Sequence, residues 1–247
     1  MLIAHATDLT GDDGPAFLHA ASLASTSRAR LVTLYAGADG GARGPDVTGV
    51  AARWGRTIMH EFRRVDREDD LADTIVEALR ALQPELVVLG THARHGIAAL
   101  LHASVAEAIA RNLDVPVLIV PNHARGFVDQ AGMLDVQRIL VPAGNGNEAR
   151  AGLAAAKKLL ALTGDGAVPI ELLHRGAIEP DLANIGARIV RIEGVLEDAI
   201  VEAAKIARPC IIVMPTHGHD GVNDVVLGSH TERVLRDAGC PVLAVPL

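Results

Sequence analysis

Apolar runs and segments with helical periodicity alternate along the whole chain. Leu86–Gly90 is an apolar run, rich in valine, that is too short for a helix and therefore predicts a buried parallel strand. Gly37–Gly55 is rich in glycine and predicts a loose loop. The remaining pattern of the first half predicts strands over Met1–Ala6, Arg30–Gly37, Thr57–Val65 and Val115–Val120, and helices over Pro15–Ser27, Leu71–Leu82 and Leu101–Asn112.

The second half of the chain repeats the first. His92 and Ser104 recur as His217 and Ser229, at a constant offset of 125 residues, and this register holds without a gap from Glu85 to Pro121. Such a long period is typical of a duplicated domain. The second copy predicts strands over Arg138–Pro142, Pro169–His174, Ala187–Ile192, Cys210–Met214 and Pro241–Val245, and helices over Ala149–Leu162, Leu196–Ala207 and Thr231–Asp237.

The order of these elements predicts an α/β fold. Strands that alternate with helices form parallel, doubly wound sheets, so each copy is expected to be a five-stranded parallel sheet with flanking helices. The sheet pattern lapses between Asn122 and Gln137. We therefore expect two tandem domains, residues 1–124 and residues 136–247.

Composition and charge exclude several classes of function. The chain has 30 acidic and 23 basic residues, for a formal net charge of −7, and only 2% of its residues are aromatic. An acidic chain with so few rings for base stacking is not expected to bind nucleic acid. No apolar run is long enough to span a membrane. Cys210 and Cys240 are too few for a disulfide framework, and we expect two buried thiols in a soluble, cytoplasmic protein.

Two loops of each copy are expected to hold a ligand. In open parallel sheets, ligands bind beyond the carboxyl ends of the strands, at the point where the strand order reverses. The loops after the first and fourth strands end there. They begin at Thr7 and Gly90 in the first copy, and at Ala143 and Pro215 in the second.

The motifs at these positions resemble the universal stress protein family, in its tandem two-domain form. The resemblance extends over nearly the whole chain and depends on Thr7–Asp8, Val87–His92, Ser104–Glu107 and Val115–Val120, most of which recur in the second copy. It implies two domains of the adenine nucleotide alpha hydrolase-like fold in a cytoplasmic protein of the stress response that acts by binding. Family members that bind ATP carry a Gly-x2-Gly-x9-Gly-Ser/Thr loop after the fourth strand and an Asp after the first.

Neither copy matches that pattern completely. The first copy keeps the acid, Asp8, but has Ala93 and Ala103 in place of the second and third glycines. The second copy keeps the third glycine, Gly228, but has Gly144 in place of the acid. An alanine at positive φ costs about 1–2 kcal/mol, so the resemblance implies that the second copy is the better site for ATP or a related adenine nucleotide.

The resemblance assigns these candidates by position. In the second copy, Gly218, Gly228, Ser229 and His230 would hold the phosphates, and Gly144 and Asn145 would flank the nucleoside. The full set of candidate cofactor-binding residues is Gly144, Asn145, Pro215, His217, Gly218, Gly228, Ser229 and His230 in the second copy and Thr7, Asp8, Gly90 and Ser104 in the first.

The resemblance also implies how the two copies associate. The last strand of each copy is an apolar edge strand in this family, and an apolar edge must be covered or paired. We expect the two last strands to pair as a pseudo-dimer within the chain. The alternative is that the linker around Phe127 covers each edge. The sequence does not decide whether two chains form a homodimer, or which client protein is bound.

Two rival functions stay open. His217 and His219 could ligate zinc in a metal-dependent hydrolase of a small substrate, because imidazole suits zinc. We do not expect zinc, because histidines in loops more often contact solvent. No catalytic residue is assigned, since Ser104 and Ser229 lie outside a nucleophile elbow and are typical of helix caps. The second rival is a ligand-free scaffold for protein–protein interaction.

Overall fold

The computed structural model describes residues 1–9, 14–37, 41–66, 70–91, 105–164, 166–175, 186–206, 210–216 and 229–247. The first half contains β1 (Leu2–Thr7), α1 (Gly14–Ser27), β2 (Arg30–Ala36), α2 (Val47–Trp54), β3 (Met59–Val65), α3 (Leu71–Leu82), β4 (Leu86–Thr91), α4 (Val105–Arg111) and β5 (Val117–Pro121). The second half contains β6 (Arg138–Ala143), α5 (Gly146–Thr163), β7 (Ile170–His174), β8 (Arg188–Arg191), α6 (Leu196–Ile206), β9 (Cys210–Thr216), α7 (Ser229–Asp237) and β10 (Val242–Pro246).

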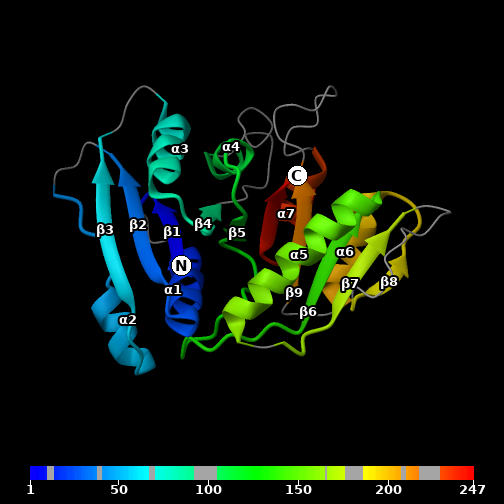
Figure 1. Ribbon diagram of the computed structural model, residues 1–247, viewed down its shortest axis with the longest axis horizontal. Helices are drawn as coiled ribbons and strands as arrows, with labels where there is room; N and C mark the ends of the chain where they lie inside the picture. The colour runs from blue at the N-terminus through cyan, green and yellow to red at the C-terminus, as the bar shows by residue number, and fades with distance from the viewer. Residues whose placement is uncertain are drawn as a thin grey trace.

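The described strands form one sheet in the order β3-β2-β1-β4-β5-β10-β9-β6-β7-β8 (Figure 1). Each half contributes five parallel strands, and the halves join where β5 pairs with β10 in antiparallel orientation. Ile119 lies opposite Val242 in this pair. The predicted fold class, with two doubly wound halves paired through their last strands, is confirmed.

Helices cover both faces of the sheet. One buried cluster contains side chains of α1, α2 and α5, and the other contains side chains of α3, α4, α6 and α7. The central strands are apolar on both sides because both of their faces are buried, as in β5, whose residues are all buried. Cys210 and Cys240 are thiols buried in the second cluster. Within the described residues, no helix is long and apolar enough to cross a bilayer.

One local prediction is wrong. The segment Gly37–Gly55 is not a loose loop throughout, because it contains the helix α2. The carboxylate of Asp46 caps this helix by accepting a hydrogen bond from the N–H of Gly49, and Gly55 ends it with a φ of 61°. The caps outweigh the glycine content of the residues that precede the helix, and Trp54 anchors the helix in the core.

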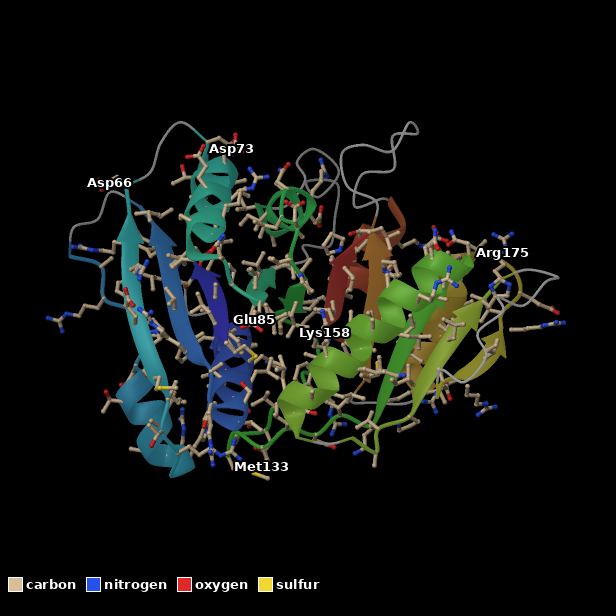
Figure 2. The ribbon with its side chains drawn as sticks, in the orientation of Figure 1. Asp66, Asp73, Glu85, Met133, Lys158 and Arg175 are labelled. Atoms are coloured by element: carbon tan, nitrogen blue, oxygen red, sulfur yellow. The ribbon has the colours of Figure 1, made fainter. Side chains whose placement is uncertain are left out.

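Residues 122–137, which we call the strap, connect the two halves. Phe127 of the strap is 1% exposed and packs on α1 rather than over the edge of β5. Met133, farther along the strap, lies below α1 and beside the lower end of α2 in the view of Figure 2. The alternative in which the linker around Phe127 covers the sheet edges is therefore wrong for β5, since β10 occupies that edge.

Candidate functional site

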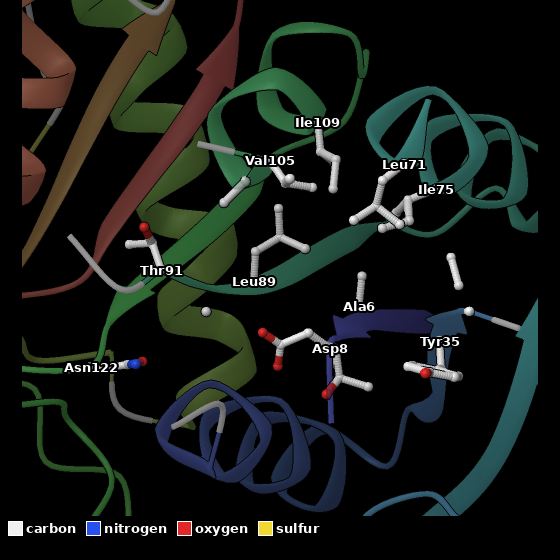
Figure 3. A pocket seen from close by; sticks show the side chains of 15 residues that line it. Ala6, Asp8, Tyr35, Leu71, Ile75, Leu89, Thr91, Val105, Ile109 and Asn122 are labelled. Atoms are coloured by element: carbon white, nitrogen blue, oxygen red, sulfur yellow. The ribbon is translucent and has the colours of Figure 1, made fainter. Parts of the chain in front are cut away.

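A cavity of about 540 Å³ opens at the carboxyl ends of β1, β2 and β4 (Figure 3). The chain passes from β1 to β2 and β3 on one side, then returns to β4 on the other, so the strand order reverses between β1 and β4. This is the position at which doubly wound sheets bind ligands. The described lining residues are Ala6, Thr7, Asp8, Tyr35, Ala36, Gly37, Leu71, Ile75, Leu89, Gly90, Thr91, Val105, Ala106, Ile109 and Asn122.

A tight turn presents Asp8 at the mouth of β1. The hydroxyl of Thr7 accepts a hydrogen bond from the N–H of Leu9 at 2.8 Å, and Leu9 has a φ of 60°. A non-glycine residue in this left-handed conformation is uncommon and strained, and such strain often marks a functional turn. The turn leaves Asp8 exposed, and Figure 3 shows its carboxylate between Tyr35 and Thr91.

The opposite side of the cavity is fixed by backbone contacts between strands. Thr91 ends β4, and its carbonyl accepts a hydrogen bond from the N–H of Asn122 at 3.0 Å. The second half repeats this contact, because the N–H of Leu247 donates to the carbonyl of Thr216 at 3.0 Å. Both contacts extend the pairing of the fourth and fifth strands of their half by one residue.

Most of the cavity wall is apolar, and the charge at its mouth is negative. Leu71 and Ile75 of α3 and Ile109 of α4 close one side, while Leu89 contributes from the sheet. Among the described lining residues, Asp8 is the single charged side chain. A site with this lining suits a ligand that has a flat apolar part and donates hydrogen bonds to a carboxylate.

The corresponding turn of the second half is arranged differently. Asn145 caps α5, and its side-chain oxygen accepts hydrogen bonds from the N–H groups of Asn147 and Glu148 at 2.9 and 3.0 Å. The carboxylate of Glu148 accepts from the N–H of Gly144 and from the side-chain amide of Asn145, both at 2.6 Å. Gly144 and Asn145 therefore belong to the N-terminal cap of α5, a structural role that the sequence analysis did not assign to them.

Sequence comparison supplies the family of this fold. A family model described as "Universal stress protein family" matches residues 60–121 and 171–246, one segment in each half and more than half of the chain together. The chain belongs to the universal stress protein family. The two matched segments also confirm its tandem form.

Individual relatives agree with this assignment. Universal stress protein MJ0531 of Methanocaldococcus jannaschii is 46% identical over 54 residues, which cover 22% of this chain and 32% of that protein. The match thus spans about a third of the curated relative's length. A universal stress protein from Archaeoglobus fulgidus superposes with a TM-score of 0.69 at 18% identity, over 99% of this chain and 96% of its own. A functionally unknown protein from Pseudomonas aeruginosa PAO1 superposes with a TM-score of 0.69 at 15% identity, over 99% and 92%. At such identities the two structures show the fold.

The structure brings together part of the candidate site of this universal stress protein. Thr7, Asp8 and Gly90 line the same cavity, while Pro215 lies half-buried near the end of β9. The other candidates fall outside the description: Ser104, His217, Gly218 and Gly228 are not among the described residues, and Ser229 and His230 begin α7 but their side chains are not described. The assignment of the nucleotide to the second half stays a prediction.

Sequence reasoning missed several lining residues. Tyr35 lies one residue before the end of β2 and Asn122 follows β5, so both lie at the same edge of the sheet as Asp8. A search extended to the ends of all five strands would have found them. The contribution of α3 and α4 could not be found in this way, because helix placement above the sheet depends on packing.

The described residues hold no group of three or more His, Cys, Asp or Glu side chains that could bind a metal ion. His217 and His219, the pair considered for zinc, lie outside the described ranges. The metal-dependent hydrolase therefore has no support from the described geometry.

Proposed function

We propose that this universal stress protein acts by reversible binding of an adenine nucleotide or nucleoside in the cavity of its first half. The observation that carries the proposal is the placement of Asp8, which a strained turn holds exposed at the reversal point of the strand order. The volume of about 540 Å³ is within the range of cavities that bind small ligands.

The chemistry of the lining assigns a place to each part of the ligand. The planar base contacts the apolar wall of Leu71, Ile75 and Ile109, where its burial is favourable. The carboxylate of Asp8 accepts hydrogen bonds from hydroxyl or amino groups of the nucleoside. Because the described lining contains no cationic side chain, the phosphates depend on backbone N–H groups near Gly90 and on the predicted contact with Ser104.

The equivalent serines of the two halves allow a matched test. We would measure binding of ATP, AMP and adenosine by calorimetry to the wild type and to Asp8→Asn, Ser104→Ala and Ser229→Ala. Loss of one hydrogen bond to a charged group corresponds to roughly tenfold to a hundredfold weaker binding, which we expect for Asp8→Asn. Ser104→Ala is expected to weaken the binding of ATP and AMP more than the binding of adenosine.

Two outcomes would contradict the proposal. If Ser229→Ala weakens binding while Asp8→Asn and Ser104→Ala do not, the ligand is bound by the second half, as the glycine–serine sequence there favours. If the wild type shows no saturable binding at millimolar concentrations of all three compounds, a ligand-free scaffold replaces the proposed function.

A further inference from the structure

The strap is attached to the first half by a buried histidine. His19 of α1 is 3% exposed and bonds at both ring nitrogens. Its Nδ1 lies 2.7 Å from the carbonyl oxygen of Pro15, and its Nε2 lies 3.0 Å from the backbone nitrogen of Phe127. A carbonyl can only accept and an N–H can only donate, so Nδ1 carries the proton and Nε2 is bare. The imidazole is therefore neutral when the strap is docked.

The surroundings of His19 prevent the ring from adapting to a second proton. The ring of Phe127 packs edge-on against the imidazole, with the two centroids 4.5 Å apart. A Cβ at Gly126 would overlap the imidazole, which shows how closely the strap backbone lies on the ring. A proton on Nε2 would place two donors against each other in a site without solvent, and this costs the full desolvation of a buried charge.

The side chains of Ser22, Trp54 and Arg56, which hold the distal part of the strap on the first half, do not titrate in mild acid. The hydroxyl of Ser22 donates to the carbonyl of Gly132 at 2.7 Å, and Arg56 donates to the same oxygen at 2.8 Å. The indole N–H of Trp54 donates to the carbonyl of Gln130 at 3.0 Å. These contacts hold the distal part of the strap, whereas His19 holds the part around Phe127.

We propose that His19 and Phe127 form an acid-sensitive latch, which docks the strap on α1 at neutral pH and releases the Phe127 end when His19 is protonated. The strap begins at the cavity, since Asn122 is a lining residue, and it is the covalent connection between the halves. The antiparallel pair of β5 and β10 is separate from the latch and holds the halves together when the strap opens.

The direction of the pKa shift agrees with the geometry. Burial lowers the pKa of His19 from 6.5 to about 4, and the hydrogen bond to the Pro15 carbonyl opposes this change. α1 carries no other ionisable side chain. The elements that pack against His19 or α1 carry further ionisable residues: His5 on β1, Arg30 and Tyr35 on β2, His60 on β3, Arg53 on α2, Arg56 after it, His123, Arg125, Asp129 and Asp135 in the strap, and Glu148, Arg150, Lys157 and Lys158 on α5.

Hydrogen exchange tests the latch in the full-length protein. When the strap opens, His19 regains its ordinary pKa, so the opening equilibrium should rise roughly twentyfold between pH 7 and pH 5. We expect exchange of the Phe127 amide, corrected for the intrinsic effect of pH, to rise by this factor, while amides of β5 stay protected. His19→Gln should lose this dependence, because glutamine offers a donor and an acceptor but does not titrate in this range.

A second histidine of the strap provides the matched control. His123 is exposed, and its ring bonds to the carbonyl of Arg236, so His123→Gln should keep the acid response of the wild type. An unchanged exchange rate of Phe127 between pH 7 and pH 5, or a response that persists in His19→Gln, would overturn the latch. If His19→Gln does not fold, the pKa of His19 is measured instead by NMR titration of the wild type. A pKa near 4 supports the latch, and one near 6.5 overturns it.

Discussion

Leu118 of β5 lies opposite Leu243 of β10 in the antiparallel pair that joins the two halves of the sheet. Both side chains are at most 1% exposed and belong to the same buried cluster as α1 and α5, the helices that pack together across the junction. The junction therefore has the packing of a protein core. This arrangement predicts that the halves unfold together.

Replacing either leucine should destabilise the whole chain. We expect Leu118→Ala and Leu243→Ala each to lower the free energy of unfolding by about 2–5 kcal/mol, because each leaves a cavity in the core. The double variant should show a coupling of about 0.5–3 kcal/mol in urea denaturation, since the two residues share one site. Val190→Ala on the edge strand β8, a half-buried position, should cost about 1 kcal/mol. Strictly additive leucine effects would argue against direct contact in solution.

Gly55 of the first half and Gly132 of the strap offer a test of packing at positive φ. Gly132 has a φ of 72°, and a Cβ there would overlap the indole of Trp54, whereas Gly55 has a φ of 61° and open space around it. Gly55→Ala should cost about 1–2 kcal/mol from backbone strain alone. Gly132→Ala adds overpacking of roughly 1–3 kcal/mol and should displace the strap. Thermal unfolding of the two variants measures the difference, and equal costs would contradict the packing of Gly132 on Trp54.

The size of the cavity should depend on Gly37. A Cβ at this position would overlap the ring of Tyr35, so Gly37→Ala should push the ring from its place on the cavity wall. We expect roughly tenfold weaker binding of adenosine, corresponding to about 1.4 kcal/mol. Gly166 of the second half has open space around its Cα, so the control variant Gly166→Ala should bind adenosine with the affinity of the wild type. Unchanged affinity in Gly37→Ala would show that the ligand does not reach Tyr35.

Overall stability should fall in mild acid. His19 has a lower pKa in the folded chain, about 4, than in the unfolded chain, about 6.5, so the unfolded state binds protons more readily. Its contribution is fully present above pH 6.5, is lost as the pH falls toward 4, and changes no further below that. The expected loss is on the order of 3 kcal/mol.

His60 should act in the same direction. Burial lowers its pKa first, and the nearby His5 lowers it further. Urea denaturation of the wild type and of His19→Gln between pH 7 and pH 4 measures how much of the loss of stability is due to His19. A stability that is equal at both ends of this range would contradict the burial of a neutral His19.

Much of the fold could be predicted from local pattern. Leu71–Leu82 begins and ends as expected, with the carboxylate of Asp70 accepting hydrogen bonds from the N–H groups of Ala72 and Asp73. Most boundaries agree with the structure to within a few residues because buried strands and amphipathic helices have distinct periods. The helix α2 was missed because the glycines of Gly37–Gly55 were interpreted as a loop, and Asp46 and Gly55 were not considered as helix caps.

The candidate site could be predicted only in part. Asp8 and Gly90 follow strands that the pattern located, so their place at the carboxyl edge followed from topology. Gly144 occupies the position of Asp8 in the second copy, but the carboxylate of Glu148 already binds its N–H. That contact depends on how α5 begins, which the offset of the repeat does not contain.

The sequence by itself determined the duplication, the alternation of strands and helices, and the family. These features are written in local order and in the repeat, and they hold for any arrangement of side chains that buries the apolar runs. Tertiary structure decided that α3 and α4 close the cavity, and that Phe127 docks on His19, 108 positions earlier in the chain. Contacts between residues so far apart depend on helix packing and on shape, so neither periodicity nor motif spacing records them.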